Sequence, residues 1–171
     1  CPQTLNAGAR RCRKPRCAPL NKRPKMNDAK IAKLADRDGS LLLSVYTIGL
    51  EAASECCMVV QELRKQTLRD RMEIIVVAPN KEGFDEKLFE GFGAHQWLIV
   101  PPIVECGKVM ADGARAARAP YVTYAEEHSY FEEHWAERLV AAHELGYEAV
   151  GFAMENANPK TLASWAHLYG Q

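Results

Sequence analysis

The sequence contains no apolar segment long enough to cross a membrane. Its longest apolar run, 41–50, is interrupted by Ser44, Thr47 and Gly49. It has about half of the ~20 residues that a membrane-spanning helix needs. The first 25 residues also lack the apolar stretch and the small-residue cleavage site of a secretory signal. We therefore expect no membrane span and a cytoplasmic location.

Several motifs with well-known chemistry are also missing. No G-x-x-x-x-G-K-[ST], G-x-G-x-x-G or G-x-S-x-G segment occurs, and His143-Glu144 lacks the second histidine of H-E-x-x-H. P-loop, dinucleotide-binding, hydrolase-elbow and zinc-protease interpretations therefore lose their main support. The cysteines form no C-x-x-C pair, which favours reduced thiols over a disulfide or a metal site. The six cysteines are Cys1, Cys12, Cys17, Cys56, Cys57 and Cys106.

The neutral total charge conceals two parts of opposite sign. Residues 1–25 hold eight of the 22 basic residues and no acid, which leaves 14 basic and 22 acidic residues in 26–171. The basic part has four prolines and few large apolar side chains, so we expect a disordered tail. Two interpretations of this tail are open. It is either an arm that binds nucleic acid or an acidic partner, or a non-native leader ahead of Met26, and we favour the leader. The acidic body is not expected to bind nucleic acid.

Strand and helix patterns alternate along the acidic body. Nearly continuous apolar runs predict buried strands at 41–47, 73–78, 96–100, 121–125 and 148–154. Helical spacing of apolar residues predicts helices at 53–65, 106–118 and 133–145. In the second helix, Val109, Gly113 and Ala117 form a stripe that would let it approach a sheet closely. This alternation predicts an α/β fold with three layers and a mostly parallel sheet.

Polar groups follow three of the predicted strands, where ligands bind in open parallel sheets. The three places are Ile48-Gly49-Leu50-Glu51, Ala78-Pro79-Asn80 and Glu126-Glu127-His128. The last combines two carboxylates with an imidazole, which are oxygen and nitrogen ligands for a divalent cation that could hold a diphosphate.

Strand alternation places Glu126 and His128 on one side and Glu127 on the other, so the first two form the better ligand pair. The alternative is an exposed acidic turn that is stabilised by the dipole of the helix starting near Glu133. A second Glu-Glu-His at 132–134 is interpreted as the solvated start of that same helix.

Four segments in this order resemble the nucleotide-sugar-binding half of GT-A, family 2 type glycosyltransferases, over about residues 41–158. They are Leu-Ser-Val-Tyr-Thr, Glu-Leu-Arg-Lys-Gln-Thr before Glu-Ile-Ile-Val-Val, the stretch 107–121, and Tyr-Val-Thr-Tyr-Ala-Glu-Glu-His followed by Trp-Ala-Glu-Arg-Leu. In that family the strand matching 121–125 ends in an Asp-x-Asp that binds Mn²⁺ or Mg²⁺ and, through it, the diphosphate of a nucleotide sugar. The matching positions are Glu126 and His128, with Glu127 between them, as in a divergent branch of the family.

The resemblance also implies a GT-A-like fold and donor contacts near five further residues, with no catalytic residue assigned. These residues are Gly49, Glu51, Asn80, Lys108 and Asp112. The acceptor-binding half and the catalytic base of inverting members would follow Gln171, so we expect a truncated domain with donor-binding residues in 26–171.

Two functions remain open on the sequence. One is a glycosyltransferase-like domain that binds a nucleotide-diphospho-sugar through a divalent metal, for transfer to an unknown acceptor hydroxyl. The other is a non-catalytic nucleotide- or partner-binding α/β module, in which Glu-Glu-His is only a turn.

Overall fold

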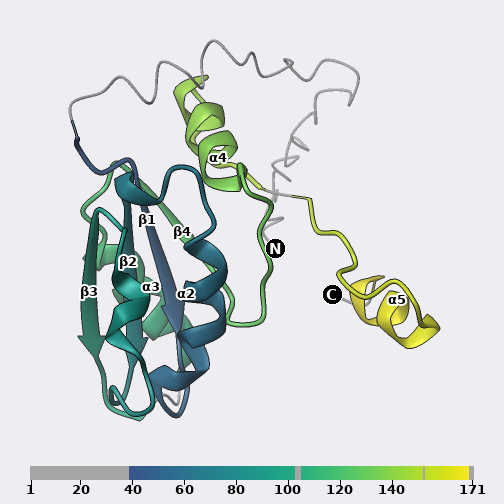
Figure 1. Cartoon of the computed structure of the whole chain (residues 1–171), viewed down its shortest axis with the longest axis horizontal. Helices are drawn as coiled ribbons and strands as arrows, with labels where there is room; N and C mark the ends of the chain where they lie inside the picture. Colours follow the sequence, from purple (N-terminus) through teal and green to yellow (C-terminus); the bar gives the residue numbers. More distant parts are fainter. Residues whose placement is uncertain (1–38, 103–104, 152, 170–171) are drawn as a thin grey trace, which may run out of the picture.

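The computed structural model describes residues 39–102, 105–151 and 153–169 (Figure 1). The predictions for residues 1–25 and for Met26, and with them Cys1, Cys12 and Cys17, lie outside these ranges. The three described cysteines, Cys56, Cys57 and Cys106, are free thiols.

Four parallel strands form the centre of the molecule, and they confirm the predicted α/β class. They are β1 (Leu43–Ile48), β2 (Met72–Ala78), β3 (Ala94–Ile99) and β4 (Tyr121–Tyr124), in the order β3-β2-β1-β4. Each neighbouring pair is parallel. The two inner strands, β1 and β2, are buried along their whole length, which explains why they read as continuous apolar runs.

Helices cover both faces of the sheet. The helical segments of the described residues are η2 (Ala53–Cys56), α2 (Cys57–Leu63), η3 (Arg69–Arg71), η4 (Glu86–Phe89), α3 (Cys106–Ala116), α4 (Trp135–Glu144) and α5 (Leu162–Tyr169), and those that pack on the sheet are α2, η4, α4 and α3. Side chains of α2, η4 and α4 pack on the face formed by Val45, Ile74 and Val76. On the opposite face, Val109 of α3 packs against Tyr46 and its neighbours. The three-layer arrangement is therefore confirmed.

The predicted close approach of α3 to the sheet occurs at Gly113. A Cβ atom added there would lie 2.7 Å from Cδ2 of Tyr46, so only a residue without a side chain fits at this spacing. α3 can therefore rest directly on the ring of Tyr46 in β1.

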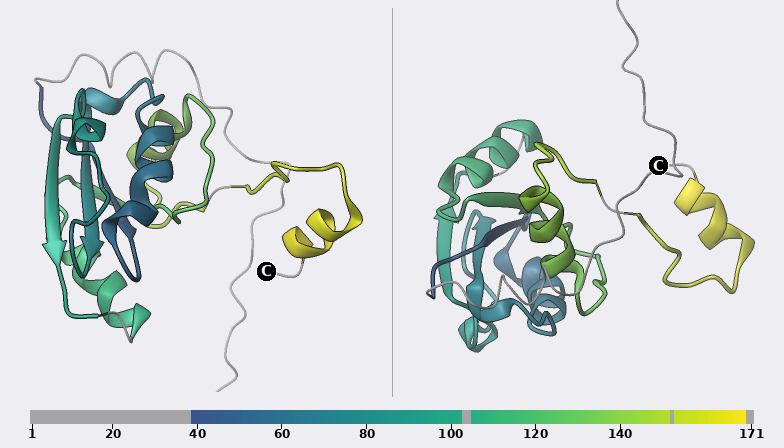
Figure 2. Two further views of the ribbon diagram at one scale, coloured as in Figure 1. Left: turned by 60° about the horizontal axis from the view of Figure 1, so that its bottom comes forward. Right: turned by 90° about the horizontal axis from the view of Figure 1, so that it is seen from above.

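The prediction of a strand at 148–154 is wrong, because none of the described residues of this segment belongs to a strand. The right-handedness of connections between parallel strands explains why this segment forms no strand. α4 lies on the same face as α2, and the connection through α2 leads from β1 to β2. A right-handed connection from β4 through α4 would return the chain to the place where β1 already pairs. The segment instead leads away to α5, which lies apart from the sheet in every view (Figures 1 and 2).

No helix among the described residues combines the length and the apolar character that a bilayer span requires.

One carboxylate lies fully buried in the sheet. Glu73 of β2 accepts hydrogen bonds from Ser44 Oγ (2.5 Å), Gln96 Nε2 (3.1 Å) and the backbone N–H of Arg118 (2.9 Å), and it pairs with the Arg118 guanidinium. These donors come from β1, β3 and the connection between α3 and β4. Burial alone would raise the pKa of Glu73, but the hydrogen bonds from Ser44 and Arg118 outweigh burial and lower it.

Candidate functional site

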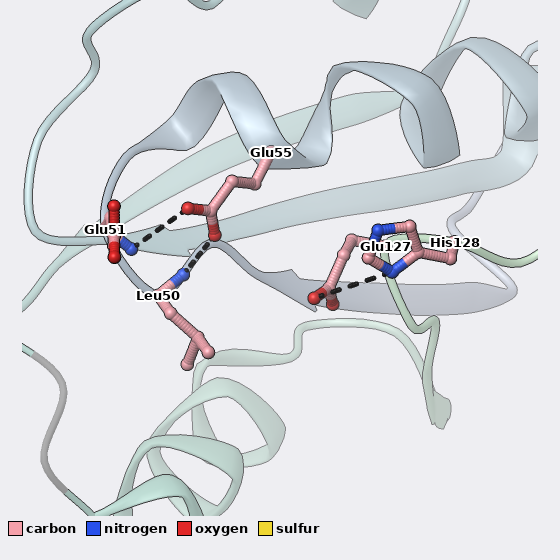
Figure 3. A pocket seen from close by; sticks show the side chains of 5 residues that line it. All are labelled: Leu50, Glu51, Glu55, Glu127 and His128. Atoms are coloured by element: carbon pink, nitrogen blue, oxygen red, sulfur yellow. Dashed lines mark hydrogen bonds and ion pairs between the residues drawn. The ribbon is translucent and has the colours of Figure 1, made fainter.

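A cavity of about 350 Å³ lies at the carboxyl ends of β1 and β4 (Figure 3). It is lined by Leu50, Glu51, Glu55, Glu127 and His128. The first three follow β1, and the last two follow β4. The chain runs from β1 to β2 on one side of the sheet, whereas β4 pairs with β1 on the other side. The cavity therefore lies at the switch point of the topology, where open parallel sheets bind their ligands.

The wall that follows β1 is held by hydrogen bonds to the backbone. The Glu55 carboxylate accepts the N–H groups of Leu50 (2.6 Å) and Glu51 (3.3 Å), as Figure 3 shows. Asn80 Nδ2 donates to the carbonyl oxygen of Glu51 at 3.1 Å and so ties the loop after β2 to the loop after β1. A Cβ atom at Gly49 would lie 2.2 Å from the carbonyl oxygen of Ala52.

These contacts separate the predicted donor-binding residues by role. Gly49 allows the tight turn and Asn80 ties two loops together, so both shape the wall. Glu51 lines the cavity itself. Lys108 and Asp112 are not among the lining residues: they form an ion pair of 2.7 Å on α3, and Arg115 also reaches Asp112 at 3.2 Å. The ion pair with Lys108 lowers the pKa of Asp112.

The wall that follows β4 brings three candidate metal ligands together. One ligand atom from each of Glu126, Glu127 and His128 lies within 4.8 Å of the others. His128 Nδ1 is 3.0 Å from Glu126 Oε1 and 3.8 Å from Glu127 Oε1. The hydrogen bond with Glu126, strengthened by its charge, raises the pKa of His128.

A turn produces this grouping, and strand alternation does not. β4 ends at Tyr124, and the N–H of Ser129 donates to the carbonyl oxygen of Glu126 at 3.0 Å, which closes a β-turn. Within this turn the Glu127 side chain is 19% exposed, against 49% for Glu126 and 78% for His128. Glu127 was expected on the opposite side, yet it is the carboxylate of the turn that lines the cavity.

Two groups next to the turn, Tyr124 and Cys56, are kept in their neutral forms by raised pKa values. Burial, with smaller contributions from the charges of Glu127 and Glu126, raises the pKa of Tyr124 to about 12. Burial likewise raises the pKa of the Cys56 thiol to about 12, so that this cysteine is not a thiolate nucleophile at neutral pH.

The second Glu-Glu-His, at 132–134, does not join the cluster. Glu132 pairs with Arg138, and His134 Nδ1 lies 2.9 Å from Glu137. The segment directly precedes α4, as expected of a helix start.

Sequence reasoning missed Glu55 as a cavity residue. A signal was present, because Glu55 comes three residues after Ala52, the residue that precedes η2. An acid at this position often reaches back to backbone N–H groups at the start of a helix.

No protein-family model matches the chain, and no curated protein sequence matches it. Among solved structures, the crystal structure of S. aureus TarS is similar, with a TM-score of 0.49 and 16% sequence identity. The similarity covers 67% of this chain and 24% of the TarS chain, so the chain spans about a quarter of that protein. The likeness concerns the fold and extends neither to a family nor to a site.

Proposed function

We propose that the cavity binds a divalent cation and, through it, the diphosphate of a nucleotide sugar. The chain would then be the donor-binding part of a glycosyltransferase that acts on an acceptor hydroxyl. The observation that carries this proposal is the grouping of Glu126, Glu127 and His128 within 4.8 Å, beside a cavity at the switch point of a parallel sheet.

The chemistry of the donor set fits a divalent cation. Carboxylate oxygens suit Mg²⁺ and Mn²⁺, and imidazole suits first-row transition metals, so the combination favours Mn²⁺. When bound, such a cation would neutralise charge that develops on a departing diphosphate.

The charge of the cavity makes the cation a requirement for binding an anion. Three carboxylates line it, from Glu51, Glu55 and Glu127, and His128 is the only lining residue that can carry a positive charge. A diphosphate alone would be repelled by these carboxylates. We therefore expect nucleoside diphosphates to bind only together with the cation.

The sequence resemblance supports a nucleotide sugar as the ligand. The alternative is a nucleotide- or partner-binding module without catalysis, in which the turn holds no metal. The two functions differ in whether binding depends on Mn²⁺ and on the side chains of the turn.

Calorimetric titration of the 171-residue protein separates the two functions. UDP and GDP are titrated with and without Mn²⁺, into the unaltered protein and into a variant with Glu126→Ala and His128→Ala. A matched control carries Glu132→Ala and His134→Ala in the second Glu-Glu-His. We expect Mn²⁺-dependent binding that the first pair of changes abolishes and the control retains. Binding that is indifferent to Mn²⁺ and to the first pair would refute the proposal.

A further inference from the structure

We infer that the three side chains of the turn have different roles: Glu127 and His128 hold the cation, and Glu126 is a positioning residue that acts through them. This inference rests on the proposed function and assigns a role to each residue of its site. The ligand pair differs from the pair Glu126 and His128, which strand alternation predicted.

Both carboxylate oxygens of Glu126 are already engaged within the turn. Oε2 accepts the backbone N–H of His128 at 3.0 Å and the hydroxyl of Ser129 at 3.4 Å. Oε1 faces His128 Nδ1 at 3.0 Å. Glu126 therefore fixes the backbone of the turn and the orientation of the imidazole ring, and it is not among the residues that line the cavity.

The carboxylate of Glu127, in contrast to that of Glu126, is not engaged in hydrogen bonds of the turn. Glu127 is the least exposed of the three side chains and lines the cavity together with His128. Within the described residues its carboxylate accepts no hydrogen bond, and His128 Nδ1, at 3.8 Å, is too far away to donate one. Its oxygens therefore keep their capacity to bind a ligand.

Of the two other carboxylates that line the cavity, that of Glu55 is engaged in the same way as that of Glu126. Glu55 uses both oxygens to accept the N–H groups of Leu50 and Glu51. Glu127 is therefore the uncommitted carboxylate next to the imidazole. The pair places one oxygen donor and one nitrogen donor at the cavity wall, and Glu126 holds the backbone and the ring of His128.

Glutamine variants distinguish a ligand from a positioning residue. Glu126→Gln keeps a carbonyl oxygen that can accept the N–H of His128, so the turn should survive. Glu126→Ala removes that acceptor. Glu127→Gln keeps the shape of the side chain but loses the charge with which a carboxylate binds a cation. Rescue by glutamine is therefore expected at position 126 and not at position 127.

The experiment measures the Mn²⁺ affinity of the full chain by the electron paramagnetic resonance signal of free Mn²⁺. We expect Glu126→Gln to change the dissociation constant by about threefold or less, and Glu126→Ala to weaken binding about tenfold, as loss of an outer-shell partner does. Glu127→Gln should weaken it by more than about tenfold. Glu133→Gln, in the second Glu-Glu-His, is the control and should leave the affinity unchanged.

A spectroscopic signature adds a readout that folding alone does not move. The electron spin echo of bound Mn²⁺ should carry the nitrogen modulation of the His128 imidazole, and Glu126→Gln should keep it. Equal losses of affinity in Glu126→Gln and Glu127→Gln would overturn the inference while leaving the proposed function intact. An unaltered protein that binds no Mn²⁺ would overturn both.

Discussion

The buried carboxylate of Glu73 offers a sharp test of what holds the sheet together. We consider Glu73→Gln, which keeps the volume of the side chain and removes its charge. In the unaltered protein this carboxylate receives hydrogen bonds from Ser44, Gln96 and two N–H groups of Arg118. An amide has one oxygen to accept with, and its NH₂ group would face donors. Some of these donors would therefore lose their partner inside the sheet.

The expected loss follows from the energies of such contacts. A hydrogen bond to a charged group contributes about 1.5–3 kcal/mol, and a buried donor left without a partner costs about 1–3 kcal/mol. The Arg118 side chain is 57% exposed, so water screens its charge and limits its share. We therefore expect Glu73→Gln to lower the free energy of unfolding by about 2 kcal/mol at pH 7.

The effect should depend on pH in a defined direction. The pKa of Glu73 in the folded protein lies below its ordinary value of 4.5. A lowered pKa means that the stabilisation is complete above the unfolded value and is lost as the pH falls through the folded value. The difference between the unaltered protein and Glu73→Gln should stay constant from pH 8 to about pH 5. Below pH 4.5 it should shrink.

Urea denaturation followed by far-ultraviolet circular dichroism measures this difference at several pH values. Glu86→Gln is the control, because Glu86 forms an exposed pair with Lys81 at 3.5 Å. Such a pair should change the free energy of unfolding by less than about 0.5 kcal/mol. Equal effects of Glu73→Gln and Glu86→Gln at pH 7, or a Glu73→Gln effect that persists unchanged at pH 3, would refute the reasoning.

Two further predictions concern packing. Gly113→Ala should destabilise the protein by about 1–3 kcal/mol, because the new Cβ would lie 2.7 Å from the ring of Tyr46. Gly107→Ala, in the same helix but with nothing within 4 Å, should be neutral or stabilise by up to about 1 kcal/mol, and equal melting temperatures of the two variants would contradict this account. Leu63→Ala should cost about 2–5 kcal/mol in urea denaturation because Leu63 is fully buried, whereas the exposed Leu162→Ala should cost little; similar midpoints would show that α2 does not anchor the core as described.

Local sequence patterns predicted most of the fold, because a strand that is buried on both faces is recognisable as an apolar run in the sequence. β1 and β2 are covered on both sides, so most positions along them are apolar. The helices that cover them carry an apolar stripe for the same reason. The strand expected at 148–154 shows the limit of such patterns. Its residues favour a strand, but a place in the sheet depends on the handedness of the connection and on β1 already being beside β4.

The candidate site, too, was predictable from the sequence only in part. The residue types after β4 are metal-capable whatever the fold, and their position at a strand end was readable from the pattern, so Glu126, Glu127 and His128 could be named without coordinates. Which carboxylate turns into the cavity was decided by the β-turn that ends at Ser129, and the opposite wall was decided by Glu55 capping the loop after β1. The chemistry of a side chain belongs to its residue type, whereas its direction and its partners depend on contacts between segments far apart in the chain, which arise only when the chain has folded.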